Sequence, residues 1–436
     1  MNRRQTLAAL MSATTPLSAM SQTNTGFAHV PWSHQTNIYE VNVRQFTPEG
    51  TLKAFEAHLP RLQQMGVSLL WFMPIQPIGK KERKGGLGSY YAIQDYTAVN
   101  PEFGTLEDFR RIVAKAHGLG MKVILDWVAN HTAWDHPWVQ THKERYKLND
   151  KGDVFSVTFN AGTPQVEYWT DVVGLNYQDP GLWLAMTDAM VYWLKEADID
   201  GFRCDVASLV PTPFWEQARA KLDRIKPVFM LAESDQVDLH AKAFDMTYDW
   251  DLFDQLRGIA KGKADAAALK AWWTRRQAKY PSDAYRMNFT ANHDSNSWHG
   301  SCKEFYGTQA CFKAMAVLAA TLPGVPLIYG GQEAFFDKRL AFFEKDPINW
   351  RGYPLAAFYG GLLDLKRRTP ALANGQHGGT LAWLDTGGAQ VVGFRRESGA
   401  NRLDVYVNLG AQRQDIKAAD GSTLSLPAWG WATQHT

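Results

Sequence analysis

The segment TLEDFRRIVAKAHGLGMKVILDWVANH (residues 105–131) combines two patterns that together decide the fold. In its first part, 105–120, apolar residues recur at three- and four-residue spacing after a Thr, and the pattern closes at a Gly, which predicts an amphipathic helix. Residues 122–128 form a short apolar run, which is typical of a buried strand. Polar residues follow that run at Asn130 and His131. The segment therefore predicts a helix that leads into a buried strand with a polar end.

The same alternation of apolar runs and amphipathic stretches continues in both directions along the chain. Apolar runs predict eight strands, at 38–46, 68–75, 122–128, 200–207, 228–234, 243–249, 286–294 and 325–333. Amphipathic stretches predict helices at 51–66, 105–120, 182–197, 264–277, 311–322 and 354–369. Repeated βα units of this kind predict a parallel sheet, and eight of them predict an α/β fold of the (β/α)8 TIM barrel type.

Two regions interrupt or follow this barrel pattern. Residues 132–180 are too long for a turn and carry the polar run KLNDKGD, which predicts a small excursion domain after the third strand. Residues 376–436 are short alternating runs with Gly-rich turns, which predict a C-terminal antiparallel β domain of the sandwich type. The catalytic barrel would then comprise residues 23–131 and 181–375.

The first 22 residues have the features of a targeting segment. Arg3 and Arg4 precede a mildly apolar run and then a polar stretch, which predicts a signal peptide over residues 1–22. The Arg pair also resembles a twin-arginine export signal, although Ser, Thr and Pro interrupt the apolar run. We therefore expect a bacterial protein that is exported to the periplasm or outside the cell.

Composition restricts the classes of partner. The 46 basic and 44 acidic residues give a formal net charge of +2, so the basic surface that nucleic-acid binding requires is not expected. Beyond the N-terminus there is no apolar run of membrane-spanning length, so we expect no membrane partner. Aromatic residues make up 13% of the chain, and such rings suit the faces of sugars. We expect a monomer.

Polar side chains gather at the ends of four predicted strands, which is where the active sites of such barrels lie. In chain order they are Asp126, Asn130 and His131, then Arg203 and Asp205, then Glu233, and finally Asn292, His293 and Asp294. A single Asp after a strand is more often a helix cap, and a single His is more often a structural group. Four such strand ends around one axis instead indicate a functional site with clustered carboxylates.

These residues lie in four motifs that resemble the signature regions of the α-amylase family of glycoside hydrolases. The motifs, in the family's order, are DWVANHT (126–132), GFRCDVA (201–207), LAES (231–234) and FTANHD (289–294). Similar segments at 88–109, 322–333 and 342–350 extend the resemblance over nearly all of the chain after about residue 36. The resemblance implies a retaining hydrolase of α-1,4-glucosidic bonds, with starch-type glucans or malto-oligosaccharides as its substrate.

The resemblance also implies the catalytic residues. Asp205 would be the nucleophile, Glu233 the acid/base and Asp294 the stabiliser of the transition state. Cleavage with retention requires a proton donor to the leaving oxygen and a carboxylate that attacks the anomeric carbon from a short distance away. Two carboxyl groups on neighbouring strands meet that requirement.

Four further residues match the family's substrate-binding positions. The resemblance implies that Arg203 orients Asp205, that His131 and His293 hold hydroxyl groups of the sugar at the cleaved bond, and that Tyr91 stacks on its ring. Arg203 lies two residues before Asp205, so an extended strand places both side chains on one face. A fixed positive charge there would keep the nucleophile ionised.

The sequence departs from the family at the calcium position between excursion and barrel. Many relatives bind the ion through the Asn of the first motif and an Asp before an LNY-like run, but here Gly174 precedes that run. One hard oxygen ligand is therefore missing. We expect no metal site and no required cofactor, while a structural calcium ion stays open as an alternative because Asn130 remains.

A second departure concerns the leaving-group side of the site. Where amylases that act on long chains often carry a Lys-His pair, this chain has Ser208 and Leu209. A transglycosylase or an α-glucosidase with the same triad is therefore kept as an alternative to the hydrolase. A more remote alternative is an inactive relative that only binds glycans, and the intact triad argues against it.

Two groups of residues stay ambiguous in the sequence. Cys302 and Cys311 are close enough along the chain to bridge in an oxidising compartment, whereas Cys204 is expected to be a buried thiol. Trp134 and Trp298 follow predicted strands and would either stack on glucose or cover the barrel.

Overall fold

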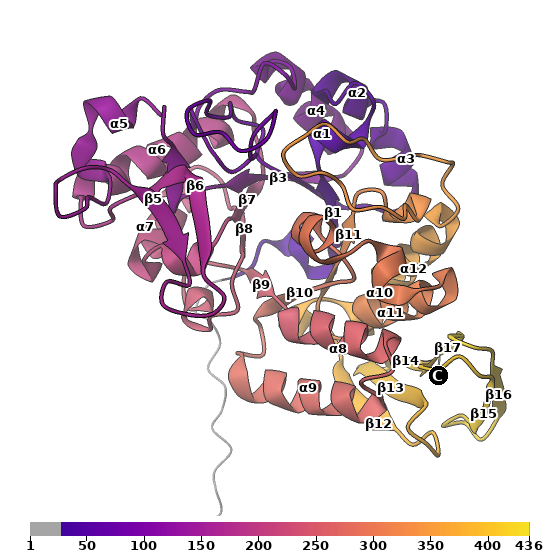
Figure 1. Ribbon diagram of the computed structural model, residues 1–436. Coiled ribbons are helices and arrows are strands. Elements are labelled where there is room, and N and C mark those ends of the chain that lie inside the picture. The colour runs from indigo at the N-terminus through magenta and orange to yellow at the C-terminus, as the bar shows by residue number, and fades with distance from the viewer. Residues whose placement is uncertain (1–27, 436) are drawn as a thin grey trace, which may run out of the picture.

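The computed structural model describes residues 28–435, in three parts (Figure 1). The signal peptide predicted at 1–22 lies outside the described residues. A barrel forms the body of the molecule, a small sheet projects from one side of it, and a C-terminal β domain lies at the other end. Within residues 28–435, no helix is both long enough and apolar enough to cross a membrane.

Eight parallel strands close into a barrel, in the order β1-β11-β10-β9-β8-β7-β3-β2. They are β1 (Ile38–Val41), β2 (Leu69–Phe72), β3 (Lys122–Trp127), β7 (Gly201–Cys204), β8 (Phe229–Ala232), β9 (Met246–Tyr248), β10 (Tyr285–Phe289) and β11 (Val325–Tyr329). All but one of their side chains are buried, as the apolar runs require for strands covered on both faces. The predicted TIM barrel is confirmed, including its sixth strand at 243–249.

Helices surround the barrel. They are α1 (Val43–Phe46), α2 (Leu52–Glu56), α3 (Leu59–Gln64), α4 (Leu106–Gly118), α6 (Pro180–Glu196), α7 (Thr212–Asp223), α8 (Trp250–Ala260), α9 (Ala266–Lys279), α10 (Cys302–Tyr306), α11 (Gln309–Thr321) and α12 (Ala356–Arg368). The single helix predicted at 51–66 is divided into α2 and α3, because Pro60 occupies the first turn of a new helix. Helices α1, α7, α8 and α10 were not among the predicted ones, and α1 forms the end of the segment 38–46 that was predicted to be a strand.

The excursion after β3 contains a three-stranded antiparallel sheet in the order β4-β6-β5. Its strands are β4 (His131–Ala133), β5 (Ser156–Phe159) and β6 (Glu167–Gly174), and the short helix α5 (Trp138–Thr141) lies between β4 and β5. The first strand begins at His131, which places a predicted substrate-binding residue at the junction of excursion and barrel.

The C-terminal part is antiparallel, as predicted. Strands β12 (Thr380–Leu384), β13 (Val391–Ser398), β14 (Asn401–Asn408) and β17 (Trp431–His435) form one sheet, and β15 (Gln414–Lys417) pairs with β16 (Thr423–Leu426) in another. Val391 and Tyr406 of the larger sheet share a buried apolar cluster with Ile416 and Leu426 of the smaller one. Strand β14 also contacts α11, which attaches this part to the barrel.

The cysteines are unpaired. Cys302 and Cys311 are buried free thiols at the starts of α10 and α11, so the bridge left open by their spacing is not formed. Cys204 is buried at the end of β7, as expected.

Candidate active site

The three predicted catalytic carboxylates lie at one rim of the barrel. Asp205 and Glu233 directly follow β7 and β8, whose last residues pair with each other, so the two side chains are neighbours. Asp294 follows β10 on the same rim. The side chains of Asp205, Glu233 and Asp294 are 11%, 15% and 37% exposed, so each one reaches solvent. This rim is the end of a TIM barrel at which active sites are built.

The guanidinium of Arg203 contacts three carboxylates of the site. Its side chain is fully buried, and one terminal nitrogen lies 2.9 Å from Asp126 Oδ1 and 3.1 Å from Asp205 Oδ1. The other terminal nitrogen lies 3.1 Å from Glu233 Oε2. The Nε–H group donates to the hydroxyl of Tyr248 at 3.1 Å. One planar guanidinium thus offsets the repulsion among three carboxylates.

The environment raises the pKa of two of these carboxyl groups. Burial raises the pKa of Asp126 to about 6, against the opposing effect of Arg203. For Asp205, burial and then the charge of Glu233 raise the pKa well above its usual range, and Arg203 again opposes the rise. Arg203 is therefore the main group that favours an ionised Asp205.

A strained turn fixes the position of Glu233. Val206, directly after Asp205, has left-handed backbone angles of φ 35° and ψ 47°, which β-branched residues rarely adopt. In this conformation the Val206 backbone N–H donates to Glu233 Oε2 at 2.7 Å. Strain of this kind is typical of functional sites, because the surrounding structure must maintain it. Here it holds the carboxylate of Glu233 beside that of Asp205.

His293 joins the site through Glu40, which the sequence analysis did not single out. His293 Nδ1 lies 2.5 Å from Glu40 Oε1, and Nε2 lies 2.7 Å from the Tyr91 hydroxyl and 3.3 Å from Asp294 Oδ2. Burial alone would lower the pKa of His293, but the carboxylates of Asp294 and Glu40 raise it to about 9. The imidazole is therefore charged at neutral pH. The sequence did contain a signal for Glu40, because it is an acidic residue within the otherwise uncharged run IYEV (38–41).

Tyr91 and His131 complete the predicted set. The Tyr91 hydroxyl donates to Asp126 Oδ2 at 3.1 Å, and its ring stacks on His293 with the centroids 5.6 Å apart. His131 hydrogen-bonds the backbone of Tyr91, and burial lowers the pKa of His131 to about 3, which keeps it neutral. All seven predicted site residues therefore belong to one connected network. Trp71, whose Nε1–H donates to Asp126 at 3.1 Å, also belongs to it and was not predicted.

The family's calcium position lacks one of the ligands that many relatives have. The side-chain NH2 group of Asn130 lies 3.1 Å from His131 Nδ1, and the Asn130 backbone oxygen accepts from the N–H of Leu175. Gly174 supplies no carboxylate, and a Cβ there would lie 3.4 Å from the side chain of Lys147, a cation. Over residues 28–435, no cluster of three or more His, Cys, Asp or Glu side chains is placed to hold a metal.

Comparison with known proteins identifies the family. Residues 18–167 and 165–350 match the family described as "Alpha amylase, catalytic domain". The chain is 28% identical to the alpha-amylase MalA of Haloarcula japonica over 91% of this chain and 57% of that protein. It is 30% identical to an alpha-1,4-glucan:maltose-1-phosphate maltosyltransferase of Rhodospirillum rubrum over 87% of this chain and 56% of that protein.

The chain thus spans little more than half the length of these two relatives. A crystal structure of an alpha-amylase from Lactobacillus plantarum superposes with a TM-score of 0.83 at 28% identity, covering 93% of this chain and 99% of that one. The family match covers most of the barrel and all four motifs. The protein therefore belongs to the alpha-amylase family.

Proposed function

We propose that this protein is a retaining glycoside hydrolase that cleaves α-1,4-glucosidic bonds in starch-type glucans or malto-oligosaccharides. The observation that carries the proposal is the sharing of one guanidinium by Asp205 and Glu233, each 3.1 Å from Arg203. Two carboxylates held on the same buried cation lie close together. A short separation between the two carboxyl groups is the geometry of retaining enzymes, whereas inverting enzymes leave room for a water molecule between them.

The reaction has two steps. Asp205 attacks the anomeric carbon while Glu233 gives its proton to the glycosidic oxygen, so the C–O bond breaks and a glycosyl ester forms on Asp205. Water then attacks the same carbon, Glu233 takes the proton from that water, and Asp205 leaves as a carboxylate. Each step inverts the carbon, so the product keeps the α configuration.

The other residues support the charge that develops on the sugar. Arg203 favours ionised Asp205, and Asp294 stabilises the positive charge of the oxocarbenium-like transition state. The ring of Tyr91 packs on the sugar at the cleaved bond. The charged ring of His293 and the neutral ring of His131 hold its hydroxyl groups.

A transglycosylase is the second candidate, favoured by one observation. Leu209, four residues after Asp205, is an apolar side chain that is 40% exposed, at the sequence position where many amylases carry a residue of the leaving-group side. Such a surface favours a sugar over water as the acceptor that attacks the glycosyl ester. The same triad would then transfer the glycosyl unit, and an α-glucosidase with this triad would release single glucose units.

We also propose that the protein is exported, on the basis of the segment at residues 1–22, and that it acts as a monomer without a cofactor. A fractionation assay of the full chain in a bacterial host tests export. The outcome against it is full-length protein with residues 1–22 intact in the cytosol.

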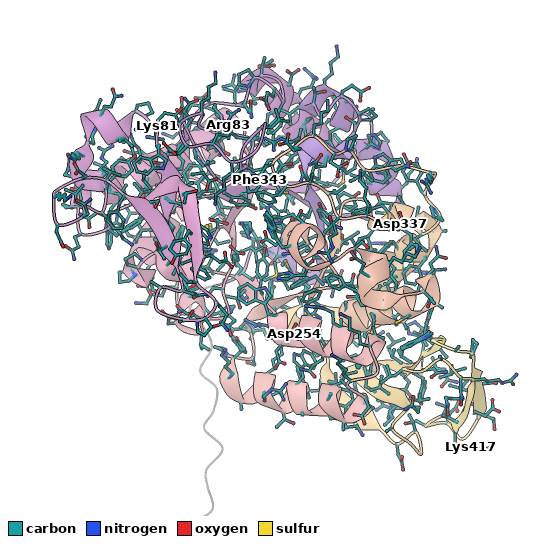
Figure 2. The ribbon with its side chains drawn as sticks, in the orientation of Figure 1. Lys81, Arg83, Asp254, Asp337, Phe343 and Lys417 are labelled. Carbon is teal, nitrogen blue, oxygen red and sulfur yellow. The ribbon has the colours of Figure 1, made fainter. Side chains whose placement is uncertain are left out.

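The test of the main proposal is a timed product analysis with maltoheptaose, in which NMR reads the anomer first released. We expect shorter malto-oligosaccharides as α-anomers. Asp205→Asn and Glu233→Gln should each lower kcat/KM by roughly a thousandfold or more, because each removes a group that acts in the chemical step. Asp254→Asn on the outer helix α8 (Figure 2) is the matched control and should retain full activity.

Each other outcome has a distinct meaning. Products longer than the substrate would favour the transglycosylase, and release of glucose alone would favour the α-glucosidase. Released β-anomers would refute retention. No turnover of any α-glucan by wild-type protein would favour the binding relative.

A further inference from the structure

One acidic side chain of the barrel, that of Glu40, is fully buried next to the site. Glu40 belongs to β1, where its backbone pairs with that of Trp71 in β2 and with that of Tyr329 in β11, the strand beside β1 (Figure 1). A buried charge is costly unless a partner of opposite charge or a hydrogen-bond donor compensates it. Glu40 therefore requires a partner inside the barrel.

His293 is that partner. Its Nδ1 lies 2.5 Å from Glu40 Oε1, and its backbone N–H donates to the same oxygen at 3.4 Å. Among the described residues, Glu40 Oε2 has no hydrogen-bond partner. So short a contact between a ring nitrogen and a carboxylate oxygen is typical of a charge-assisted hydrogen bond. Nδ1 therefore carries a proton that it donates to Glu40.

The other ring nitrogen of His293, Nε2, is also a donor. It lies 2.7 Å from the Tyr91 hydroxyl and 3.3 Å from Asp294 Oδ2. The hydroxyl has a single hydrogen, which Tyr91 donates to Asp126 Oδ2 at 3.1 Å. Toward Nε2 the hydroxyl oxygen can then only accept, and an ionised Asp294 can also only accept. With a proton on each nitrogen, His293 is an imidazolium.

The charges around His293 favour this form. Burial would lower the pKa of His293, but the charges of Asp294 and Glu40 and the hydrogen bond to Glu40 raise it to about 9, while Arg203 opposes the rise. Two buried phenols, Tyr248 and Tyr329, face Glu40 and are neutral, because burial raises the pKa of each well above its usual range. The ionisable groups around the ring come from five segments, and they are Glu40, Tyr91, Asp126, Arg203 and Asp294.

Loss of the proton on Nε2 would disturb the site. The lone pair of Nε2 would then face the hydroxyl oxygen of Tyr91 and the carboxylate of Asp294, which repel it. Tyr91 would have to turn its hydrogen from Asp126 to His293. In the proposed reaction Tyr91 and Asp294 both act on the sugar, so this change would misplace two groups at once.

We propose that Glu40 is a positioning residue that keeps His293 doubly protonated and thereby sets the alkaline limit of activity. This inference rests on the proposed function and adds a control of the same site by pH. Glu40 is fully buried, so it acts through His293 and not on the sugar. Above the pKa of His293 the proton leaves Nε2 and activity falls. Without the charge of Glu40 this pKa is lower, so activity should be lost at a lower pH.

The test removes the charge of Glu40 and keeps its shape. In Glu40→Gln the amide oxygen can still accept from Nδ1. The substrate is α-maltosyl fluoride, because fluoride leaves without a proton from Glu233, so the basic limb of kcat/KM does not report the ionisation of Glu233. We expect this limb to move at least about one pH unit lower in Glu40→Gln. The ratio of kcat/KM, wild type over variant, should be about fivefold larger at about pH 9 than at about pH 6.

Two further variants separate charge from shape. Glu40→Asp keeps the charge on a shorter side chain and should move the basic limb less than Glu40→Gln. A merely structural role predicts the reverse, because Gln has the size of Glu whereas Asp leaves a gap. Glu333→Gln is the matched control, since it removes another fully buried carboxylate, which pairs with Arg61, and it should leave the limb in place.

NMR of histidine labelled with nitrogen-15 follows His293 without any substrate, and the loss of its signal in His293→Gln assigns it. In wild type we expect protons on both ring nitrogens at neutral pH, and in Glu40→Gln a titration at least about one pH unit lower. A neutral His293 in wild type at neutral pH would refute the inference even if the variants failed to fold.

The two measurements also separate this inference from the proposed function. If wild type cleaves glycosides but either the limb or the His293 titration stays in place in Glu40→Gln, the role of Glu40 is refuted and the hydrolase stands. If the titration moves as expected but wild type cleaves no glycoside, the hydrolase is refuted, and Glu40 still holds the charge of His293.

Discussion

At the scale of single residues, Arg203 is the centre of the site. It is the cation in contact with Asp126, Asp205 and Glu233, and burial in the barrel keeps water from screening it. Without that charge Asp205, the proposed nucleophile, would be both buried and surrounded by anions. Among the described side chains, Arg203 is the main one that favours ionised Asp205, and it opposes the effects of burial and Glu233.

This dependence predicts the result of Arg203→Lys. A single ammonium cannot contact three carboxylates as the planar guanidinium does. The pKa of Asp205, already raised by burial and Glu233, should rise further. In the proposed reaction Asp205 must be ionised to attack. The acidic limb of the pH profile of kcat/KM should therefore move to higher pH, and the maximum should fall about a hundredfold.

The control is Arg275→Lys, which changes an exposed pair with Asp251 on the outer helices and should leave the profile in place. An acidic limb that stays at the wild-type pH in Arg203→Lys would contradict the role assigned to Arg203. If kcat/KM also fell in that case, Arg203 would position the carboxylates without setting the pKa of Asp205.

At the scale of elements, local sequence sets where helices begin, and α4 shows how. Thr105 Oγ1 accepts from the Asp108 N–H at 3.1 Å, while the Asp108 carboxylate accepts from the Thr105 N–H at 2.9 Å. This capping box satisfies two donors that the helix itself leaves free. The two residues that fix the first turn of α4 are only three positions apart along the chain. The start of this helix could therefore be predicted from the sequence.

Thr105→Ala should therefore lower the free energy of unfolding by about 1 kcal/mol, because the cap is lost. Urea denaturation measures this change. Thr274→Ala is the matched control, since Thr274 is exposed inside α9 and caps nothing, so it should be neutral or slightly stabilising. An equal loss in both variants would contradict the importance of the cap.

At the scale of the whole molecule, the excursion is attached to the barrel through protein contacts. Lys84 Nζ pairs with Asp171 at 3.2 Å, and Asp135 accepts from the Lys80 N–H at 2.8 Å, so the segment after β2 is joined to the excursion at two points. Gly174 stands where many relatives have a carboxylate, and these contacts join the two parts without an ion.

We therefore expect EDTA and excess CaCl2 to give thermal midpoints within about 2 °C of each other, since an ion bound only to the folded state would raise the midpoint through linkage. Gly174→Asp restores the missing carboxylate and should show a larger calcium-dependent rise than wild type. A rise of several degrees with calcium in the wild-type protein would show that the ion binds despite the missing ligand.

The sequence by itself determined the parts of this protein that depend on neighbouring residues. The eight strands, most helices and the carboxylates at strand ends follow from apolar spacing and local caps, which act over a few residues. The α-amylase motifs were identified by resemblance to the family, which is possible because each is a continuous segment that contains the end of one strand and the turn after it.

Only the tertiary structure decided which distant residues meet. Glu40 and His293 are 253 positions apart, and their contact depends on β1 closing the barrel near β10. The ring contact between Trp298 and Phe342 likewise joins the segments after β10 and β11, which Asn296 also connects. Cys302 and Cys311 are buried free thiols in separate helices, which their spacing along the chain did not show. Contacts of this kind depend on the closed barrel as a whole, and spacing along the chain does not encode them.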